Sequence, residues 1–200
     1  MRTNGSAFNA KRRPDNVVRV EFYGHERTRL DAEAQRRADI QCQAQFHYHQ
    51  TGVFGEAAAM RALGPPLAFC HEADCGTDFL LGNVEVDVKC STNEPDRSNL
   101  IFDSLEEFVA DIAILTRIAE KSESRVEVEV IGWTTQAEFK VHACARPIRN
   151  ASKMLMQRQL LRPMHELLNA LDEVLLTGGT FDAITGAGDE PGSVHGLSAV

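Results

Sequence analysis

The pattern of hydrophobic and polar positions predicts helices towards both ends of the chain. Residues 25–50 are rich in Glu, Arg, Gln and Ala and predict a first helix. A second, shorter helix is expected within residues 51–64, beginning at Gly55 or just before it. Residues 151–176 predict a third helix, which Pro163 should break or kink.

Strand patterns occupy the middle of the chain. Valines alternate with Glu127 and Glu129 in residues 126–133, which predicts a strand with one face in water. Residues 77–91 are typical of a hairpin. The other expected strands are a short strand or extended lead-in at 17–24 and a buried strand that begins near Val109. This order of elements favours an α/β or α+β fold with helices flanking a mixed central sheet.

Length and composition fit one globular domain with loose ends. The chain has 200 residues and is 43% hydrophobic, enough for a single core. We expect a flexible basic arm and lead-in over 1–24, one domain over 25–176 and a flexible acidic tail over 177–200. No apolar run reaches transmembrane length, and the first residues lack the apolar stretch of a secretory signal, so we expect a cytoplasmic protein without membrane contact.

The charge is unevenly distributed. A net charge of −8 argues against a protein that coats nucleic acid nonspecifically. The first 41 residues, however, carry nine Lys/Arg and six Asp/Glu, whereas residues 172–200 carry five acids and no Lys/Arg. The basic residues Lys11, Arg12 and Arg13 either touch backbone phosphates or form an ordinary solvated arm.

The five cysteines indicate free thiols in a cytosolic chain. Cys70 and Cys75 flank His71, but a zinc site needs a second ligand pair at matching spacing, and none is evident. His47 and His49 are two residues apart, so they would not face one metal on a helix.

The hairpin at 77–91 has a register that can be counted from its turn. Gly82 followed by Asn83 suits a primed two-residue turn, which needs a positive φ angle. The cross-strand pairs are then Leu81 with Val84, Leu80 with Glu85, Phe79 with Val86, and Asp78 with Asp87. Slipping by one residue would undo this pairing.

This register brings together residues that can bind a cation. Asp78 and Asp87 face each other with Cβ atoms about 5 Å apart, where two like charges repel unless a divalent cation lies between them. Side-chain alternation puts Glu85, Asp87 and Lys89 on one face, so Lys89 projects towards the same place. The alternative is an ordinary half-exposed strand with a polar face.

A further carboxylate lies on the expected second helix. Glu56 shares one helical stripe with Met60 and Leu63, and a carboxylate is unexpected on an apolar stripe. Its place near the start of the helix also has a simple electrostatic reason, because a negative charge there is favourable with the helix dipole.

These residues together resemble the pattern of the PD-(D/E)xK nuclease superfamily. Glu56 in GEAAAMRAL resembles its helix acid, Asp78 in GTDFLLG its first strand acid, and Asp87-Val88-Lys89 in EVDVKCS its D-x-K signature. The resemblance covers about residues 51–140. It implies a restriction-endonuclease-like α/β fold, here with a mixed central β-sheet flanked by helices and additional N- and C-terminal helices.

The resemblance also implies a chemistry. Mg²⁺, for which Mn²⁺ should substitute, would be bound by Asp78, Asp87, the Val88 carbonyl and, directly or through water, Glu56. Lys89 would position water and stabilise the scissile phosphate. Whether Glu85 rather than Asp87 binds the metal stays open at this point.

We therefore expect a Mg²⁺-dependent nuclease acting on DNA, with a homodimer as a candidate assembly. One alternative is a catalytically inactive module of the same fold, used for binding or assembly. Another is an unrelated α/β binding protein whose hairpin merely has a polar face.

Overall fold

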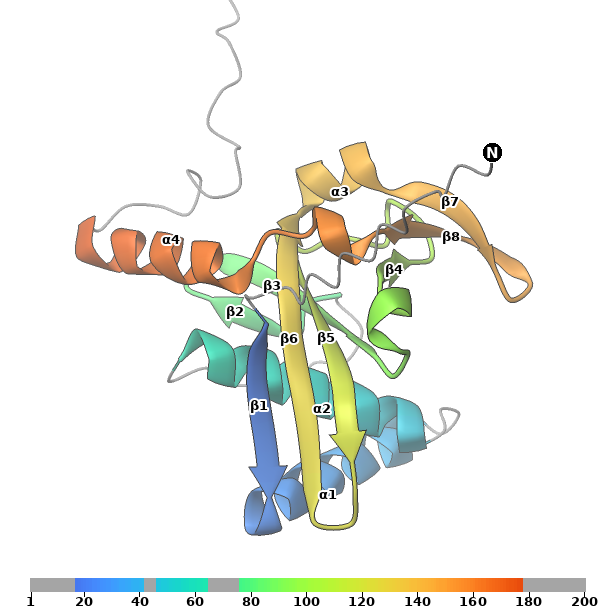
Figure 1. Cartoon of the computed structure of the whole chain (residues 1–200), viewed down its shortest axis with the longest axis vertical. Helices are drawn as coiled ribbons and strands as arrows, with labels where there is room; N and C mark the ends of the chain where they lie inside the picture. The colour runs from blue at the N-terminus through green and yellow to red at the C-terminus, as the bar shows by residue number, and fades with distance from the viewer. Residues whose placement is uncertain (1–16, 42–45, 65–75, 178–200) are drawn as a thin grey trace, which may run out of the picture.

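The centre of the computed structural model, which describes residues 17–41, 46–64 and 76–177, is a five-stranded mixed sheet (Figure 1). Its strands follow the order β1-β6-β5-β3-β2, with β3 parallel to β5 and every other neighbouring pair antiparallel. The five strands are β1 (Val18–Tyr23), β2 (Phe79–Leu81), β3 (Val84–Ser91), β5 (Ile112–Lys121) and β6 (Arg125–Thr135). The mixed sheet expected from the sequence is thus confirmed.

One face of this sheet is covered by helices, and the larger hydrophobic core lies between them. The helices that contribute to it are α1 (Gly24–Gln41), α2 (Phe46–Leu63) and α4 (Met164–Thr177). Alternate residues of the central strands, such as Val86, Val88 and Ile114, point into this core. The alternation follows from the two-residue period of a strand, which sends successive side chains to opposite faces.

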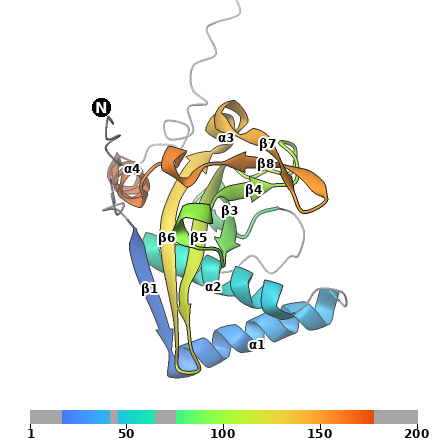
Figure 2. The same ribbon diagram turned by 45° about the vertical axis from the view of Figure 1, so that its right-hand side comes forward.

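The opposite face carries a smaller core beneath a second sheet. That sheet has the order β4-β8-β7 and is built from β4 (Leu100–Phe102), β7 (Cys144–Ile148) and β8 (Ala151–Met156). Helix α3 (Gln136–His142) lies beside it, and Figure 2 shows the β7–β8 hairpin projecting from the body of the molecule. Three fully buried rings, Phe102, Phe108 and Phe139, pack together in this core.

The structure confirms three of the four predicted cross-strand pairs of the hairpin, but the fourth, Asp78 with Asp87, is not a ladder pair, because β2 begins only at Phe79. Leu81 pairs with Val84, Leu80 with Glu85, and Phe79 with Val86. Gly82 has a φ of 66°, as a primed turn with glycine at its first central position requires. The turn of the β2–β3 hairpin therefore lies at the predicted Gly82-Asn83, and Asp78 is the residue just before β2.

The first helix, expected over 25–50, ends at Gln41, and α2 is longer than the sequence predicted. It begins at Phe46, so Gly55 lies inside the helix rather than at its start. A Cβ atom at Gly55 would lie 2.6 Å from both the Cβ of Cys90 and the Oγ1 of Thr116. The glycine is needed because the helix crosses β3 and β5 at close range, and this packing outweighs its low helix propensity.

The prediction of a helix over 151–176 is wrong for its first half. Ala151–Met156 forms strand β8, a short 3₁₀ turn (Arg158–Leu160) follows, and α4 begins only at Met164. Strand β8 pairs with β4 and β7, neither of which the sequence pattern predicted. Pairing with these distant segments overrides the local helix propensity.

Two further expectations about strands need correction. Strand β5 begins at Ile112 rather than near Val109, whose side chain is half exposed. The supposed wet face of β6 is partly closed, because Glu129 is buried and accepts two hydrogen bonds from Arg117 of β5. A buried carboxylate is tolerated there because its partner cation is buried with it.

Several expectations fall outside the described residues: the basic arm with Lys11, Arg12 and Arg13, the acidic tail, and the candidate zinc ligands Cys70, His71 and Cys75. Within the described ranges, no helix combines the length and apolar character needed to cross a bilayer.

Candidate active site at the β2–β3 hairpin

Asp78 sits where the edge strand β2 begins, and its side chain continues the hydrogen bonding of the hairpin. Its backbone N–H donates to the Val86 carbonyl at 2.8 Å. Its carboxylate Oδ2 in turn accepts from the Val88 N–H at 2.6 Å. Because the N–H and C=O of a strand residue point to the same side, the Val88 carbonyl lies on this edge as well.

Asp87 and Lys89 lie next to each other on the opposite face of β3 from the valines. Asp87 is almost completely buried, and its Oδ2 lies 2.9 Å from the Nζ of Lys89. The Lys89 ammonium also lies 4.8 Å from the centre of the Phe102 ring, which the smaller core holds in place. About a third of the Lys89 side chain remains exposed, so its charge can reach a ligand in solvent.

The two aspartates form an interacting pair. Burial, followed by the negative charges of Glu56 and Asp87, raises the pKa of Asp78 to about 7. Burial also raises the pKa of Asp87, although Lys89 and a side-chain hydrogen bond with Asp78 oppose this effect. One ammonium therefore faces two carboxylates that both favour their protonated form more than an exposed aspartate does.

Glu56 is close enough to act on Asp78, but its oxygens are already occupied. The Glu56 side chain is buried on α2, and both carboxylate oxygens accept from Arg37 of α1, at 2.7 and 2.8 Å. Glu33 also accepts from Arg37, at 3.0 Å. Helical spacing made Glu56 a candidate site residue but did not indicate Arg37 as its partner, because nothing in that spacing shows how α1 packs against α2.

A second residue that the sequence analysis missed is Glu107. Its charge raises the pKa of Asp87, although it is far along the chain and exposed. It precedes Phe108, which stacks on Phe102 at 4.7 Å between ring centres. The neighbouring Phe108 could have indicated that this segment packs into a core. Only the folded core shows that Glu107 lies close to Asp87.

The position of Glu85 answers the question of which acid faces the site. Glu85 is exposed, lies opposite Leu80 near the hairpin turn, and accepts from the Thr77 hydroxyl at 3.3 Å. Asp87, in contrast, contacts both Asp78 and Lys89. The structure thus brings Asp87, not Glu85, into the cluster.

The residues of this cluster supply hard oxygen donors in a limited number. Among the described residues, no group of three or more His, Cys, Asp and Glu side chains is arranged as a metal site. The Asp78 and Asp87 carboxylates with the Val88 carbonyl would give three protein oxygens, and Mg²⁺ commonly keeps several waters besides.

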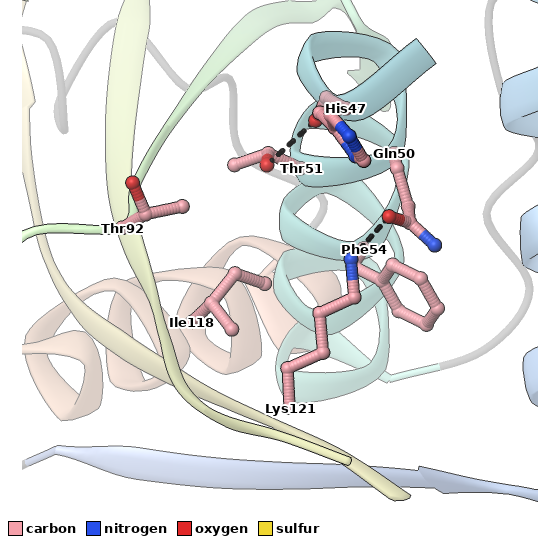
Figure 3. A pocket seen from close by; sticks show the side chains of 7 residues that line it. All are labelled: His47, Gln50, Thr51, Phe54, Thr92, Ile118 and Lys121. Atoms are coloured by element: carbon pink, nitrogen blue, oxygen red, sulfur yellow. Dashed lines mark hydrogen bonds between the residues drawn. The ribbon is translucent and has the colours of Figure 1, made fainter. Parts of the chain in front are cut away.

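Cys90 and a small hollow on α2 lie outside this cluster. Cys90 follows Lys89 but is directed into the packing of α2, where burial raises the pKa of its thiol to about 11 and makes it a poor nucleophile. A small hollow of about 190 Å³ lies further along α2 (Figure 3). Two hydrogen bonds join residues that line it: Lys121 donates to the Gln50 side-chain oxygen, and the Thr51 hydroxyl donates to the His47 carbonyl.

Comparison of the chain with known protein families, with curated proteins and with solved structures finds no match.

Proposed function

We propose that this protein is a Mg²⁺-dependent nuclease of the restriction-endonuclease-like fold that hydrolyses phosphodiester bonds in DNA. The single observation that supports it most is the adjacency of Asp78, Asp87 and Lys89, in which the buried Asp87 carboxylate contacts both the partly buried Asp78 carboxylate and the Lys89 ammonium. Buried acidic groups with shifted pKa values and one specific charge partner are typical of functional sites.

In this proposal Asp78, Asp87 and the Val88 carbonyl would hold Mg²⁺, and Glu56 adds a third negative charge nearby. The bound cation would lower the pKa of a coordinated water and offset negative charge on the phosphate. Arg37 fixes Glu56 through two charge-assisted hydrogen bonds, so that its carboxylate keeps one orientation.

Lys89 would contact the phosphate of the substrate, because part of its side chain is exposed to solvent. Its ammonium is oriented by Asp87 on one side and by the Phe102 ring on the other. A cation held in this way can bind a phosphate oxygen and stabilise the charge that develops on it during hydrolysis.

The order of elements also supports the proposed fold. A helix that carries Glu56 precedes a hairpin that carries Asp78 on one strand and Asp87 and Lys89 on the other. Strands β5 and β6 then extend the sheet on the far side of β3, although a short turn joins them where the resemblance would place a helix.

The decisive experiment compares cleavage of supercoiled plasmid and of circular single-stranded DNA, with Mg²⁺ and with EDTA. Asp87→Asn and Lys89→Met should each reduce cleavage by at least about 100-fold, since each removes a group that acts on the transition state. Glu85→Gln is the matched control, because Glu85 is an exposed acid of the same strand, and it should leave the rate unchanged.

One observation favours a second candidate, a catalytically inactive module of the same fold. Both carboxylate oxygens of Glu56 accept hydrogen bonds from Arg37, so Glu56 is not free to bind a cation. Only two acidic side chains of the proposed set, Asp78 and Asp87, then remain as ligands. If the purified protein cleaves neither substrate, or if Asp87→Asn and Lys89→Met cleave as well as the parent, the nuclease proposal fails and the binding module remains.

A further inference from the structure

A cleft of about 480 Å³ opens beside Lys89, between the first turns of α2, the segment that follows Lys89 and the turn of the β7–β8 hairpin. This volume lies within the range of ordinary small-molecule sites. Its lining residues are His47, Tyr48, Thr51, Gly52, Lys89, Cys90, Ser91, Thr92, Asn93, Asn99, Ile101, Leu115 and Arg149.

The chemistry of this cleft differs from that of the chain as a whole. The chain has a net charge of −8, yet the lining, drawn from the described residues, contains Lys89 and Arg149 and no Asp or Glu. Two amides, Asn93 and Asn99, and the hydroxyls of three neighbouring Ser and Thr residues supply neutral hydrogen-bonding groups. Cations with amides and hydroxyls suit a ligand that has both phosphate and base-edge groups.

An exposed aromatic side chain stands at the same cleft. Tyr48 lies on α2 and is 60% exposed, although a large ring usually packs against its neighbours. His47, the next ring on the helix, is exposed as well. A free aromatic face next to cations is the combination that binds single-stranded nucleic acid, with a base stacked on the ring and the backbone held by charge.

Arg149 reaches the cleft from the other side, at the turn of the projecting hairpin (Figure 2). Its φ angle is 56°, a conformation that residues other than Gly, Asn and Asp seldom adopt. The second sheet holds this turn in place through the pairing of Ile148 with Ala151. The hairpin thus presents a positive charge opposite Tyr48.

From these observations we infer that the cleft binds one unpaired nucleotide of the substrate strand, beside the phosphate that Lys89 would contact. The inference rests on the proposed nuclease function and narrows it to single-stranded or locally unpaired DNA. A concave site suits a base that has left the stack, whereas duplex bases are read by helices or ribbons that enter a groove. Tyr48 would stack on the base, and Arg149 would contact the backbone.

Binding can be measured without cleavage. Fluorescence anisotropy in EDTA, with a short fluorescein-labelled oligothymidylate and a hairpin duplex of similar length, reports affinity alone. Tyr48→Ala should weaken binding of the single strand by at least about fivefold, as loss of one stacking ring does. Tyr48→Phe should keep the affinity, and Tyr23→Ala is the matched control, because Tyr23 is also exposed but lies on β1 away from the cleft.

Arg149 needs a substitution that preserves the turn. Arg149→Asn keeps a residue that tolerates positive φ and removes the charge. It should weaken binding and lower the slope of log affinity against log salt by about one, as loss of one phosphate contact does. Arg146→Ala is the control on the same hairpin, since Arg146 is exposed on β7 and does not line the cleft.

The outcomes separate this inference from the nuclease proposal. Equal single-strand affinity for the parent and Tyr48→Ala, no single-strand binding at all, or tighter duplex binding that ignores Tyr48 would each overturn the nucleotide cleft. Binding that depends on Tyr48 in a protein that cleaves no DNA would support the cleft and reject hydrolysis. Cleavage that requires Asp87, together with single-strand binding that does not depend on Tyr48, would support the nuclease proposal and reject the nucleotide cleft.

Discussion

Asp78 is the residue in which structure and proposed chemistry meet most directly. Its carboxylate replaces a backbone acceptor for the Val88 N–H and at the same time belongs to an acidic pair with Asp87. The first contact orders the edge of the sheet, and the second costs free energy at neutral pH. An acidic side chain at a position where its charge is unfavourable indicates a role other than stability.

The first prediction concerns the pH dependence of stability. Because the pKa of Asp78 is about 7 in the folded protein and near its ordinary value when unfolded, the folded state binds more protons between these values. Stability without metal should therefore be greatest at the acidic end of this window and fall as pH rises towards 7. Asp78→Asn should remove this fall and raise the free energy of unfolding at pH 8 by on the order of 1–3 kcal/mol.

Urea denaturation in EDTA across pH 5 to 8.5 measures this effect. Glu85→Gln is the control, because it removes an exposed acid from the same hairpin. A parent protein that becomes more stable between pH 5 and 7 by an amount unaffected by Asp78→Asn would contradict the proposed state of the pair.

At the scale of elements, the contact of α2 with the sheet depends on Gly55. A methyl group there would meet Cys90 and Thr116 at 2.6 Å, so Gly55→Ala must push the helix from β3 and β5. We expect a loss of roughly 1–3 kcal/mol in stability. Gly52→Ala on the same helix should instead be neutral or gain about 0.5–1 kcal/mol, because its nearest contact is an ordinary 3.7 Å from Glu56.

Thermal or urea unfolding of the two variants provides the comparison. Helix propensity alone would make both substitutions stabilising, so equal gains would show that α2 does not approach the sheet this closely.

The ion pair between Arg37 and Glu56 joins α1 to α2. Arg37→Met should destabilise the protein by roughly 3 kcal/mol, because it leaves a buried carboxylate without its partner. Adding Glu56→Gln should recover most of this loss, which a double-mutant cycle of unfolding free energies measures. Additive losses in the cycle would mean that the pair is not coupled.

Local signals explain which elements could be predicted from the sequence. The β2–β3 hairpin followed from Gly82 and side-chain alternation. The contact between the Asp78 and Asp87 side chains was also predicted, although Asp78 lies just outside the paired strand. Strand β8 was mistaken for helix because its pairing with β4 and β7 depends on residues distant in sequence. The partner of Glu56 and the approach of Glu107 depend on how helices and cores pack, which no local pattern encodes.

At the scale of the whole molecule, the two cores make separate contributions. Phe108 is fully buried in the smaller core against Phe102 and Phe139. Phe108→Ala should cost about 3–5 kcal/mol, the usual cost of deleting a buried ring. Hydrogen exchange should show faster opening of β4 and β8 than of β5 and β6, whose larger core is intact.

The matching substitution in the larger core is Phe54→Ala, since Phe54 is equally buried and packs edge-on against Phe22. It should speed exchange in α2 and β1 instead. If both variants accelerate exchange uniformly, the molecule unfolds as one cooperative unit.

The Phe102 ring beneath Lys89 connects the cluster of Asp78, Asp87 and Lys89 to the smaller core, although all three residues belong to the hairpin region of the main sheet. Heat or denaturant that unfolds the second sheet first would remove the contact between Phe102 and Lys89 while the helices of the larger core stayed folded. The proposed DNA cleavage would then be lost at a lower temperature than the far-UV helical signal, and the difference between the two midpoints would measure how independently the two cores unfold.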